Sequence, residues 1–283
     1  MTFQFGLSNI YELRYPRAKT AVMREAGGFM DRGFKGKLRK KELLVGTVLG
    51  IASPEVAEII SEVGFDWVWI DMEHAAIDLV QAQIMTQALR EGCAAVVRVP
   101  WNDSVWIKKT LDIGCDGVIV PQIKTAEEAK AAVQASKYPS EGIRSLGLAR
   151  ASKYGMEFAD YVRKANEEIA IILQIEHIEG VNNVESIIET PGIDAIMIGP
   201  YDLSGSLGLI GQLDKPEVEG AIQKVKRQCL EKGTPVGIFA DGPESARTHI
   251  SDGVTLIGMG SDSVYLWKSA KSELERLSGS LSD

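Results

Sequence analysis

The 283-residue sequence predicts an α/β protein, specifically a closed (β/α)8 TIM barrel built from eight parallel strands. Eight short apolar runs rich in β-branched residues occur between residues 43 and 260, each bounded by Gly, Pro, Asp or Asn. The segments between these runs have the apolar spacing of helices. No G-x-G-x-x-G follows the first run, which favours the barrel over an open doubly wound sheet that binds a dinucleotide.

The elements follow one another in strict alternation. The runs predicted as strands cover residues 43–49, 65–70, 94–99, 117–120, 169–175, 194–199, 235–239 and 254–260. Residues 53–64 read as a helix because they open with a Ser cap and a Pro in the first turn and close on Gly. Residues 125–137 open with a Thr cap followed by acidic residues and end in Lys, which suits the helix dipole.

Residues 1–40 differ from the rest of the chain. They contain the irregular stretches "GGF" and "RGFKGK" and no clear strand pattern. We expect them to form an N-terminal extension that packs on the surface or on a partner subunit. Residues 41–283 are then expected to form a single catalytic barrel domain, a size that such barrels commonly reach.

Composition excludes several classes of function. The net charge of −8 without a basic face argues against nucleic-acid binding. Cys93, Cys115 and Cys229 are widely spaced, which disfavours a disulfide framework and a structural zinc site. There is no apolar run of membrane-spanning length and no secretory signal pattern. We therefore expect a cytoplasmic protein with no membrane contact.

The barrel prediction directs attention to the carboxyl ends of the strands, where active sites of this fold lie. In "VWIDMEHAA", residues 68–76, the second strand runs into Asp71, Glu73 and His74. Alternation along a strand places Asp71 and Glu73 on one side. The cluster can be a metal site, an acid/base pair in which Asp71 orients the His74 imidazole, or polar decoration of a strand end.

Two further carboxylates follow adjacent strands. Glu176 and Asp202 can converge on a hard cation such as Mg²⁺ or Mn²⁺, although each alone can also be a helix cap or a salt-bridge partner. The stretch "GPYDLSGSLG" can bind an anion at a helix N-terminus or form a plain glycine-rich turn. Arg98 lies in an apolar strand and needs a partner; it can be structural or can stabilise an enolate oxygen.

Six ordered segments resemble the HpcH/HpaI aldolase family over about residues 40–270. They are "FDWVWIDMEHA", "VVRVPWNDSVWIKKTLDIG", "VPQIKTAEEA", "KYPSEGIRSLG", "LQIEHIEGVNNV" and "IMIGPYDLSGSLG". The family comprises class II pyruvate aldolases of the phosphoenolpyruvate/pyruvate barrel superfamily. The pattern is similar to that of 4-hydroxy-2-oxoheptanedioate aldolase, and macrophomate synthase is a relative.

The resemblance implies a ligand set and a substrate cradle. Glu176 and Asp202 would bind a divalent metal ion, Mg²⁺, Mn²⁺ or Co²⁺. Gln174 and the backbone N–H groups near Tyr201 and Asp202 would hold the carboxylate of pyruvate. Arg98 would stabilise the enolate oxygen.

The remaining implied roles concern protons and assembly. His74, paired with Asp71, would move protons to and from the aldehyde oxygen, and Glu73 would bind metal-bound water. Asp112 would reach the site of a neighbouring subunit. Family members assemble as trimers or hexamers with a swapped final helix, so a homo-oligomer is expected.

The chain departs from the family pattern at four places. Tyr201 stands where relatives usually carry a small residue, Gln122 where they carry Met, and His177 where they carry Thr. The segment "GIRSLG" replaces the commoner "GxRGxG". The metal and base positions are retained, whereas the pocket for the acceptor is expected to differ from the usual one.

The expected function is therefore a metal-dependent aldolase, a carbon–carbon lyase that forms or cleaves bonds of 2-oxo acids through a pyruvate enolate. Its small-molecule partners would be a 2-oxo acid and an aldehyde. Alternatives are an oxaloacetate decarboxylase or a macrophomate-synthase-like decarboxylative enzyme, a Schiff-base aldolase using Lys124, and a barrel scaffold without catalysis.

Overall fold

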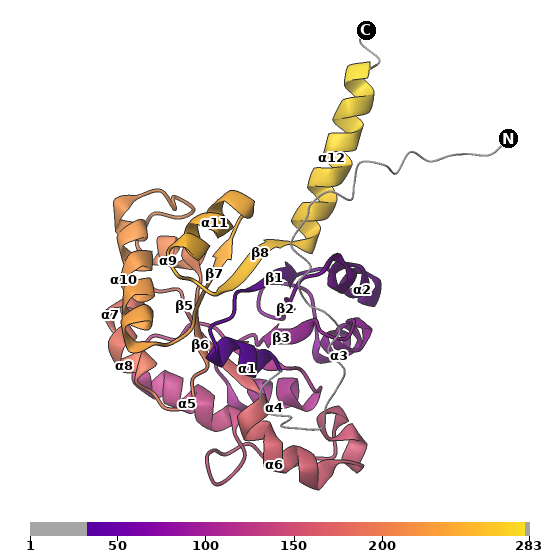
Figure 1. Ribbon diagram of the computed structural model, residues 1–283, viewed down its shortest axis with the longest axis vertical. Coiled ribbons are helices and arrows are strands. Elements are labelled where there is room, and N and C mark those ends of the chain that lie inside the picture. The colour runs from indigo at the N-terminus through magenta and orange to yellow at the C-terminus, as the bar shows by residue number, and fades with distance from the viewer. Residues whose placement is uncertain (1–32, 281–283) are drawn as a thin grey trace, which may run out of the picture.

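The computed structural model describes residues 33–280, and its centre is a closed barrel of eight parallel strands in which β8 pairs with β1 (Figure 1). The strands are β1 (Leu44–Leu49), β2 (Trp67–Asp71), β3 (Ala94–Arg98), β4 (Gly117–Val120), β5 (Ala170–Ile175), β6 (Ala195–Ile198), β7 (Val236–Ala240) and β8 (Leu256–Ser261). The (β/α)8 prediction is confirmed. Each predicted strand begins and ends within two residues of the observed one.

Helices surround the barrel, and two of them begin at the predicted N-cap residues. The Ser53 hydroxyl accepts the Val56 N–H at the start of α2, and the Thr125 and Glu128 side chains form a capping box at the start of α5. The helices are α1 (Phe34–Arg39), α2 (Pro54–Val63), α3 (Leu79–Ala88), α4 (Ser104–Asp112), α5 (Ala126–Ser136), α6 (Phe158–Glu168), α7 (Ile178–Asn182), α8 (Val184–Ile188), α9 (Pro200–Ser206), α10 (Pro216–Lys232), α11 (Pro243–Ser251) and α12 (Asp262–Ser280), with a 3₁₀ segment, η2 (Arg150–Gly155).

The barrel interior is filled by pairing large side chains with glycines. Trp67 and Trp69 of β2 are buried inside the barrel, at 0% and 2% exposure. A Cβ atom at Gly46 of β1 would lie 2.5 Å from the Trp67 ring, and one at Gly258 of β8 would lie 3.3 Å from the Trp69 ring. The neighbouring strands therefore carry glycine because the two indoles occupy the volume of a side chain there.

Helix α1 closes the N-terminal end of the barrel. Its Phe34 and Leu38 side chains are buried in the same cluster as Leu44 and Trp67, and the Phe34 and Trp67 ring centroids are 6.0 Å apart. The last residues of the segment expected as an extension thus belong to the barrel core. The rest of that segment, residues 1–32, lies outside the described residues, so the predicted domain boundary stays a prediction.

Three pairs of neighbouring strands are joined at this end by a repeated pair of hydrogen bonds, which we call the carboxylate clips. The Asp116 N–H donates to the Ala95 carbonyl, and the Ala95 N–H donates back to Asp116 Oδ2, both at 2.8 Å. The clips join Asp66 to Val45, Asp116 to Ala95, and Asp194 to Ile171. Each aspartate directly precedes an even-numbered strand and bonds the strand before it.

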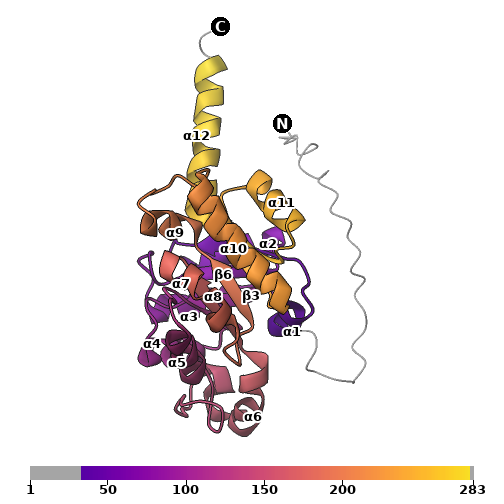
Figure 2. The same ribbon diagram turned by 90° about the vertical axis from the view of Figure 1, so that its left-hand side faces the viewer.

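Helix α12 extends away from the barrel (Figures 1 and 2). Its root is fixed because the Asp262 carboxylate accepts the N–H groups of Gly50 and Ile51 and the Tyr265 hydroxyl donates to the Met259 carbonyl. Its exposed apolar side chains are Leu266, Trp267, Leu274 and Leu277. This surface agrees with the expected swapped final helix, which stays a prediction. Among residues 33–280, no helix combines the length and apolar character needed to cross a membrane.

Candidate active site

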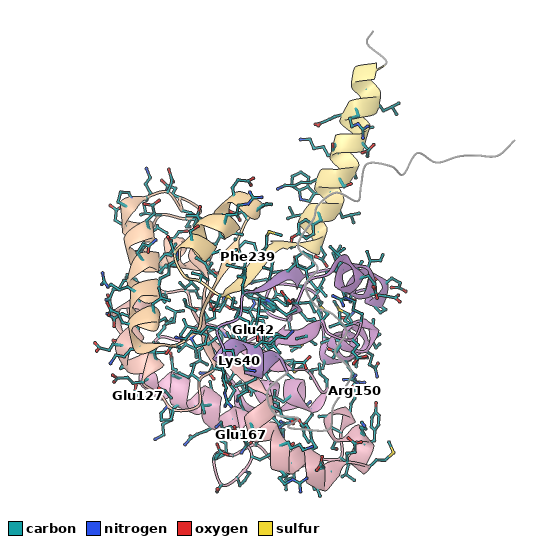
Figure 3. All side chains as sticks on the ribbon, in the orientation of Figure 1. Lys40, Glu42, Glu127, Arg150, Glu167 and Phe239 are labelled. Carbon is teal, nitrogen blue, oxygen red and sulfur yellow. The ribbon has the colours of Figure 1, made fainter. Side chains whose placement is uncertain are left out.

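A pocket of about 240 Å³ opens among the carboxyl ends of the strands, where the sequence places the candidate residues. Phe239 of β7 lies on the side of the barrel from which α12 projects, whereas Lys40 and Glu42 lie beside α1 (Figure 3). The predicted site residues that line this pocket are His74, Arg98, Gln174, Tyr201 and Asp202. Val48, Trp69, Pro200 and Phe239 are the apolar side chains among the other lining residues.

Arg98 is the buried cation of the site. Strand register places it opposite Asp71, and the guanidinium binds that carboxylate through two hydrogen bonds of 2.9 and 2.7 Å. Its third nitrogen lies 3.0 Å from Glu73 Oε2, without the alignment of a hydrogen bond. The guanidinium carbon lies 4.7 Å from the Trp69 ring centroid. Arg98 is therefore fixed on three sides before any substrate binds.

The two acids beside Arg98 respond differently to it. Burial opposes ionisation of Asp71, but the hydrogen bonds and charge of Arg98 outweigh it and hold the pKa of this carboxyl below its usual range. Burial raises the pKa of Glu73, and the charges of Asp71 and Asp202 add to that rise against the attraction of Arg98. Asp71 is thus a permanent counter-ion, and Glu73 is the more readily protonated acid.

In the structure His74 contacts Asp71 through its backbone N–H. Asp71 Oδ1 accepts the backbone N–H groups of Glu73 and His74 at 3.0 and 3.3 Å, and both oxygens of this carboxylate accept from Arg98. The His74 imidazole instead lies with Nε2 3.7 Å from Glu73 Oε2. The Asp71 side chain turns toward β3, and the expected pairing of the His74 imidazole with Asp71 stays a prediction. His74 lines the pocket and is 58% exposed, which leaves it accessible to substrate.

Glu176 follows β5 and is held by main-chain and side-chain donors. The Gln122 N–H donates to Oε1 at 2.8 Å, and the Gln174 amide donates to Oε2 at 2.5 Å. Gln122 has a φ of 59°, a left-handed conformation that directs its N–H to this carboxylate. A Cβ atom at Gly199 would lie 2.7 Å from Glu176 Oε2, so glycine there leaves the space that the carboxylate fills.

The charge around Glu176 is not balanced by the side chains near it. Burial raises the pKa of Glu176 to about 8, and the negative charges of Glu73 and Asp202 contribute to this rise. Asp71, Glu73, Glu176 and Asp202 together face one guanidinium, that of Arg98. A group of acids with this excess of negative charge fits an added cation.

The oxygen donors of Glu176 and Asp202 suit a hard divalent cation. No group of three or more His, Cys, Asp or Glu side chains is arranged to bind a metal within residues 33–280. Two protein carboxylates would leave the other coordination positions to water or substrate oxygen atoms, as Mg²⁺ commonly prefers. The residues present therefore fit the expected ion.

Gln174 is placed to bind a ligand in the pocket. Its amide nitrogen is used by Glu176, while its buried Oε1 has no hydrogen-bond partner in the described part of the chain. Helix α9 begins at Pro200 directly beside it, and Asp202 lies in the first turn. The expected role of Gln174 in holding the pyruvate carboxylate is compatible with this location and stays a prediction.

Asp112 lies away from this pocket at the end of α4. Its Oδ1 atom accepts a 2.7 Å hydrogen bond from Arg144, whose side chain is buried and packs over the ring of Tyr138 at 4.4 Å. Within this chain Asp112 therefore anchors the segment that carries Arg144. Its expected contribution to a neighbouring subunit's site stays a prediction.

Sequence reasoning missed one wall of the pocket. The Tyr201 hydroxyl donates a 2.7 Å hydrogen bond to Asp241, and the Tyr201 ring meets Phe239 edge-on with centroids 6.2 Å apart. Burial, with the hydrogen bond and charge of Asp241, raises the pKa of Tyr201 to about 12, so the hydroxyl remains a donor. Alternation along β7 puts Phe239 and Asp241 on one face, which is the signal that identifies this wall.

Comparison with known proteins identifies the family of the chain. The model of the HpcH/HpaI aldolase/citrate lyase family matches residues 45–268. The chain belongs to this family. The family resemblance inferred from the sequence is confirmed, as is the expected carbon–carbon lyase class at the level of the family.

Two relatives illustrate the range within the family. A 5-keto-4-deoxy-D-glucarate aldolase from Shigella dysenteriae is 38% identical over 243 residues, covering 85% of this chain and 94% of the relative. A 4-hydroxy-2-oxo-heptane-1,7-dioate aldolase from Escherichia coli is 36% identical over 245 residues, covering 86% and 93%.

Solved structures show the same fold. An HpcH/HpaI aldolase/citrate lyase family protein from Burkholderia cenocepacia superimposes with a TM-score of 0.83 at 35% identity, covering 86% of this chain and 98% of that one. Macrophomate synthase gives a TM-score of 0.78 at 27% identity, covering 88% and 90%. The expected relationship to macrophomate synthase is therefore confirmed.

Proposed function

We propose that this HpcH/HpaI family member is a divalent-metal-dependent aldolase that makes or breaks the carbon–carbon bond between the carbon atoms α and β to the keto group of a 2-oxo acid. The observation that carries the proposal is the uncompensated set of acids around Arg98, in which Glu176 and Asp202 have the oxygen donors for one hard cation. The relatives named as aldolases support the same reaction class.

A cation held by Glu176 and Asp202 would supply Lewis acidity toward the oxygen atoms of the 2-oxo acid. The chain itself supplies orientation and charge. The buried amide oxygen of Gln174 and the start of α9 border the place where the acid portion of the substrate would lie. Glu176 is kept in position by the N–H of Gln122 and the amide of Gln174.

Arg98 would stabilise the negative charge that develops on the keto oxygen as the enolate of pyruvate forms. A guanidinium already locked by Asp71 at 2.7 and 2.9 Å needs little reorganisation, which is what makes a fixed charge effective in catalysis. The same charge develops when oxaloacetate loses carbon dioxide. Decarboxylation is therefore an activity expected of the same residues.

His74 would transfer the proton to and from the aldehyde oxygen. Its imidazole lines the pocket and faces Glu73, whose carboxylate can balance a positive charge on the ring. Asp71 acts on His74 through its backbone N–H, fixing the turn that presents the ring.

The lysine mechanism has less support. Lys124 does not line the pocket; its backbone N–H donates to Glu128 and its carbonyl accepts from Asn183. No lysine lines the pocket among residues 33–280.

The deciding test measures pyruvate release from a panel of 4-hydroxy-2-oxo acids and oxaloacetate, with added Mg²⁺ or Mn²⁺ and with excess EDTA. We expect release to require metal and to survive borohydride treatment in the presence of pyruvate. Full activity in EDTA, or inactivation by borohydride, would overturn the proposal. The absence of release and of metal-dependent oxalate binding would instead indicate a scaffold without catalysis.

A further inference from the structure

One wall of the pocket is built from side chains to which no step of the proposed reaction has been assigned. Tyr201 follows β6 and Asp241 follows β7, two adjacent strands. The 2.7 Å hydrogen bond between them spans the strand ends, and Phe239 supports the Tyr201 ring from below. The aromatic faces of Tyr201 and Phe239 both line the pocket.

This wall lies beside the reacting end of the pocket. Tyr201 directly precedes Asp202, one of the two proposed metal ligands, so its ring stands next to the position where an aldehyde would meet the enolate. Val48 and Trp69 also line the pocket. The space left for the substituent of the aldehyde is therefore bordered by apolar side chains.

The charges near this space are unfavourable for an anionic substituent. The cationic side chains that line the pocket within the described residues are Arg98 and His74. Arg98 is already bound to Asp71 and Glu73, and His74 faces Glu73. Asp241, at the end of the Tyr201 hydroxyl, adds a further negative charge, so a second carboxylate on the aldehyde would meet like charge without a free cation to balance it.

We propose that Tyr201, Phe239 and Asp241 form an acceptor wall that selects an uncharged aldehyde over an aldehyde that carries its own carboxylate. The inference rests on the proposed aldolase function and defines the substrate class of that site. It sets this chain apart from the two relatives named above, because glucarate and heptane-1,7-dioate skeletons both carry a second carboxylate. Tyr201 acts as a specificity residue that contacts the acceptor, and Asp241 acts by its charge.

The test compares two four-carbon aldehydes, butanal and succinic semialdehyde, as acceptors for pyruvate in the presence of Mg²⁺. We expect the full-length protein to use butanal with a kcat/KM about three- to tenfold higher, since the apolar wall favours the uncharged aldehyde and the like charge of Asp241 is exposed and partly screened by solvent. Asp241→Asn should shift the ratio about three- to tenfold toward succinic semialdehyde. Glu244→Gln, which removes an exposed acid near the same loop, is the matched control and should shift the ratio by less than about twofold.

Tyr201→Phe removes the hydroxyl and keeps the ring, so it distinguishes the effects of the two groups. Without its bond to Asp241 the ring is free to rotate, so we expect the KM for butanal to rise by about three- to tenfold while kcat falls less. A purely structural role would lower the fraction of active protein and therefore kcat, with no change in KM.

Exchange of the pyruvate methyl protons in D₂O distinguishes failure of the acceptor wall from failure of the aldolase proposal. Exchange with Mg²⁺ but without aldehyde reports enolate formation alone. If exchange occurs and the wild-type protein prefers succinic semialdehyde, or Asp241→Asn shifts the ratio no more than Glu244→Gln, the acceptor wall is wrong and the aldolase function stands. If no exchange occurs, the proposed function fails and this inference fails with it.

Discussion

Lys35, in the helix that closes the bottom of the barrel, lies with its ammonium nitrogen 3.0 Å from the carboxylate of Asp194, the residue before β6. The ammonium also donates to the carbonyls of Asn166 and Ile169 at 3.2 and 2.9 Å. Both charged side chains are about 95% buried. This one lysine therefore connects α1 to the starts of β5 and β6.

Lys35→Met should destabilise the fold by about 2–4 kcal/mol, because it leaves a buried carboxylate and two carbonyls without their cationic donor. The measurement is the free energy of unfolding in urea. Lys37→Met, in the same helix but only half-buried, is the control and should cost less than about 1 kcal/mol. Equal effects of the two substitutions would mean that the buried ion pair contributes no specific stability.

Gly199→Ala should reduce catalytic activity while leaving the fold intact. The added Cβ would lie 2.7 Å from Glu176 Oε2 and 2.8 Å from Gln174 Nε2, so both side chains must shift. We expect kcat/KM to fall at least about tenfold, since small displacements of a positioned group are costly in catalysis. Gly220→Ala has open space around its Cβ and should leave activity unchanged and raise the thermal midpoint slightly.

Asp202→Ala and His74→Ala should separate two steps of the reaction. Asp202→Ala removes a proposed metal ligand and should lower both pyruvate proton exchange and aldol turnover by about 100-fold or more. His74→Ala should retain part of the exchange and lose aldol turnover by about 10²- to 10⁴-fold, because protonation of the aldehyde oxygen is a separate step. Equal, mild effects of the two substitutions on both measurements would contradict the assigned roles.

The dependence of the free energy of unfolding on pH below 7 should include a contribution from His249. Its Nδ1 atom is 2.9 Å from the buried ammonium of Lys226, and its Nε2 atom is 3.5 Å from the Ser245 hydroxyl. Burial, with the charge of Lys226, lowers the pKa of His249 to about 4, although Asp252 acts in the opposite direction. The unfolded chain therefore binds a proton at about pH 6.5 that the folded protein does not bind until about pH 4.

The contribution of His249 to stability is then expected to fall as the pH is lowered from about 6.5 toward 4, by roughly 1–2 kcal/mol after allowance for solvent around the half-buried ring. The raised pKa of Glu176 acts in the opposite direction in both proteins, so the difference between wild type and a His249 variant isolates this contribution. His249→Asn keeps an acceptor for Lys226 and cannot titrate in this range. Unfolding free energies of both proteins between pH 7 and 4.5 test the point. The same acid loss in the variant would show that other groups are responsible.

The fold was predictable from local patterns, and the site was predictable only in part. Gly, Pro and Asp mark the ends of the strands, and Ser53 and Thr125 mark the starts of two helices. These boundaries can therefore be predicted from residues that are close together in the sequence. The partners of site residues come from other strands. Asp71 binds Arg98 rather than the adjacent His74 because the register of β2 and β3 places those two side by side.

Contacts between residues far apart in the sequence also explain why the acceptor wall and the packing of α1 against the barrel were not predicted. Tyr201 and Asp241 are forty residues apart and meet only once β6 and β7 pair. The burial of Phe34 depends on its packing against Trp67, which no periodicity near residue 34 indicates. The left-handed conformation of Gln122 likewise depends on the carboxylate of Glu176.

The carboxylate clips join the strands of the barrel two by two, and one of the four odd–even pairs lacks a clip. Strand pairs β1–β2, β3–β4 and β5–β6 each carry the reciprocal aspartate bonds, whereas the corresponding position before β8 is Thr255, whose N–H donates to the Val236 carbonyl at 3.2 Å. A shorter, neutral side chain at this position leaves the β7–β8 pair without the clip that the other three odd–even pairs carry. Amide hydrogen exchange is therefore expected to be faster at the start of β8 than at the starts of β2, β4 and β6.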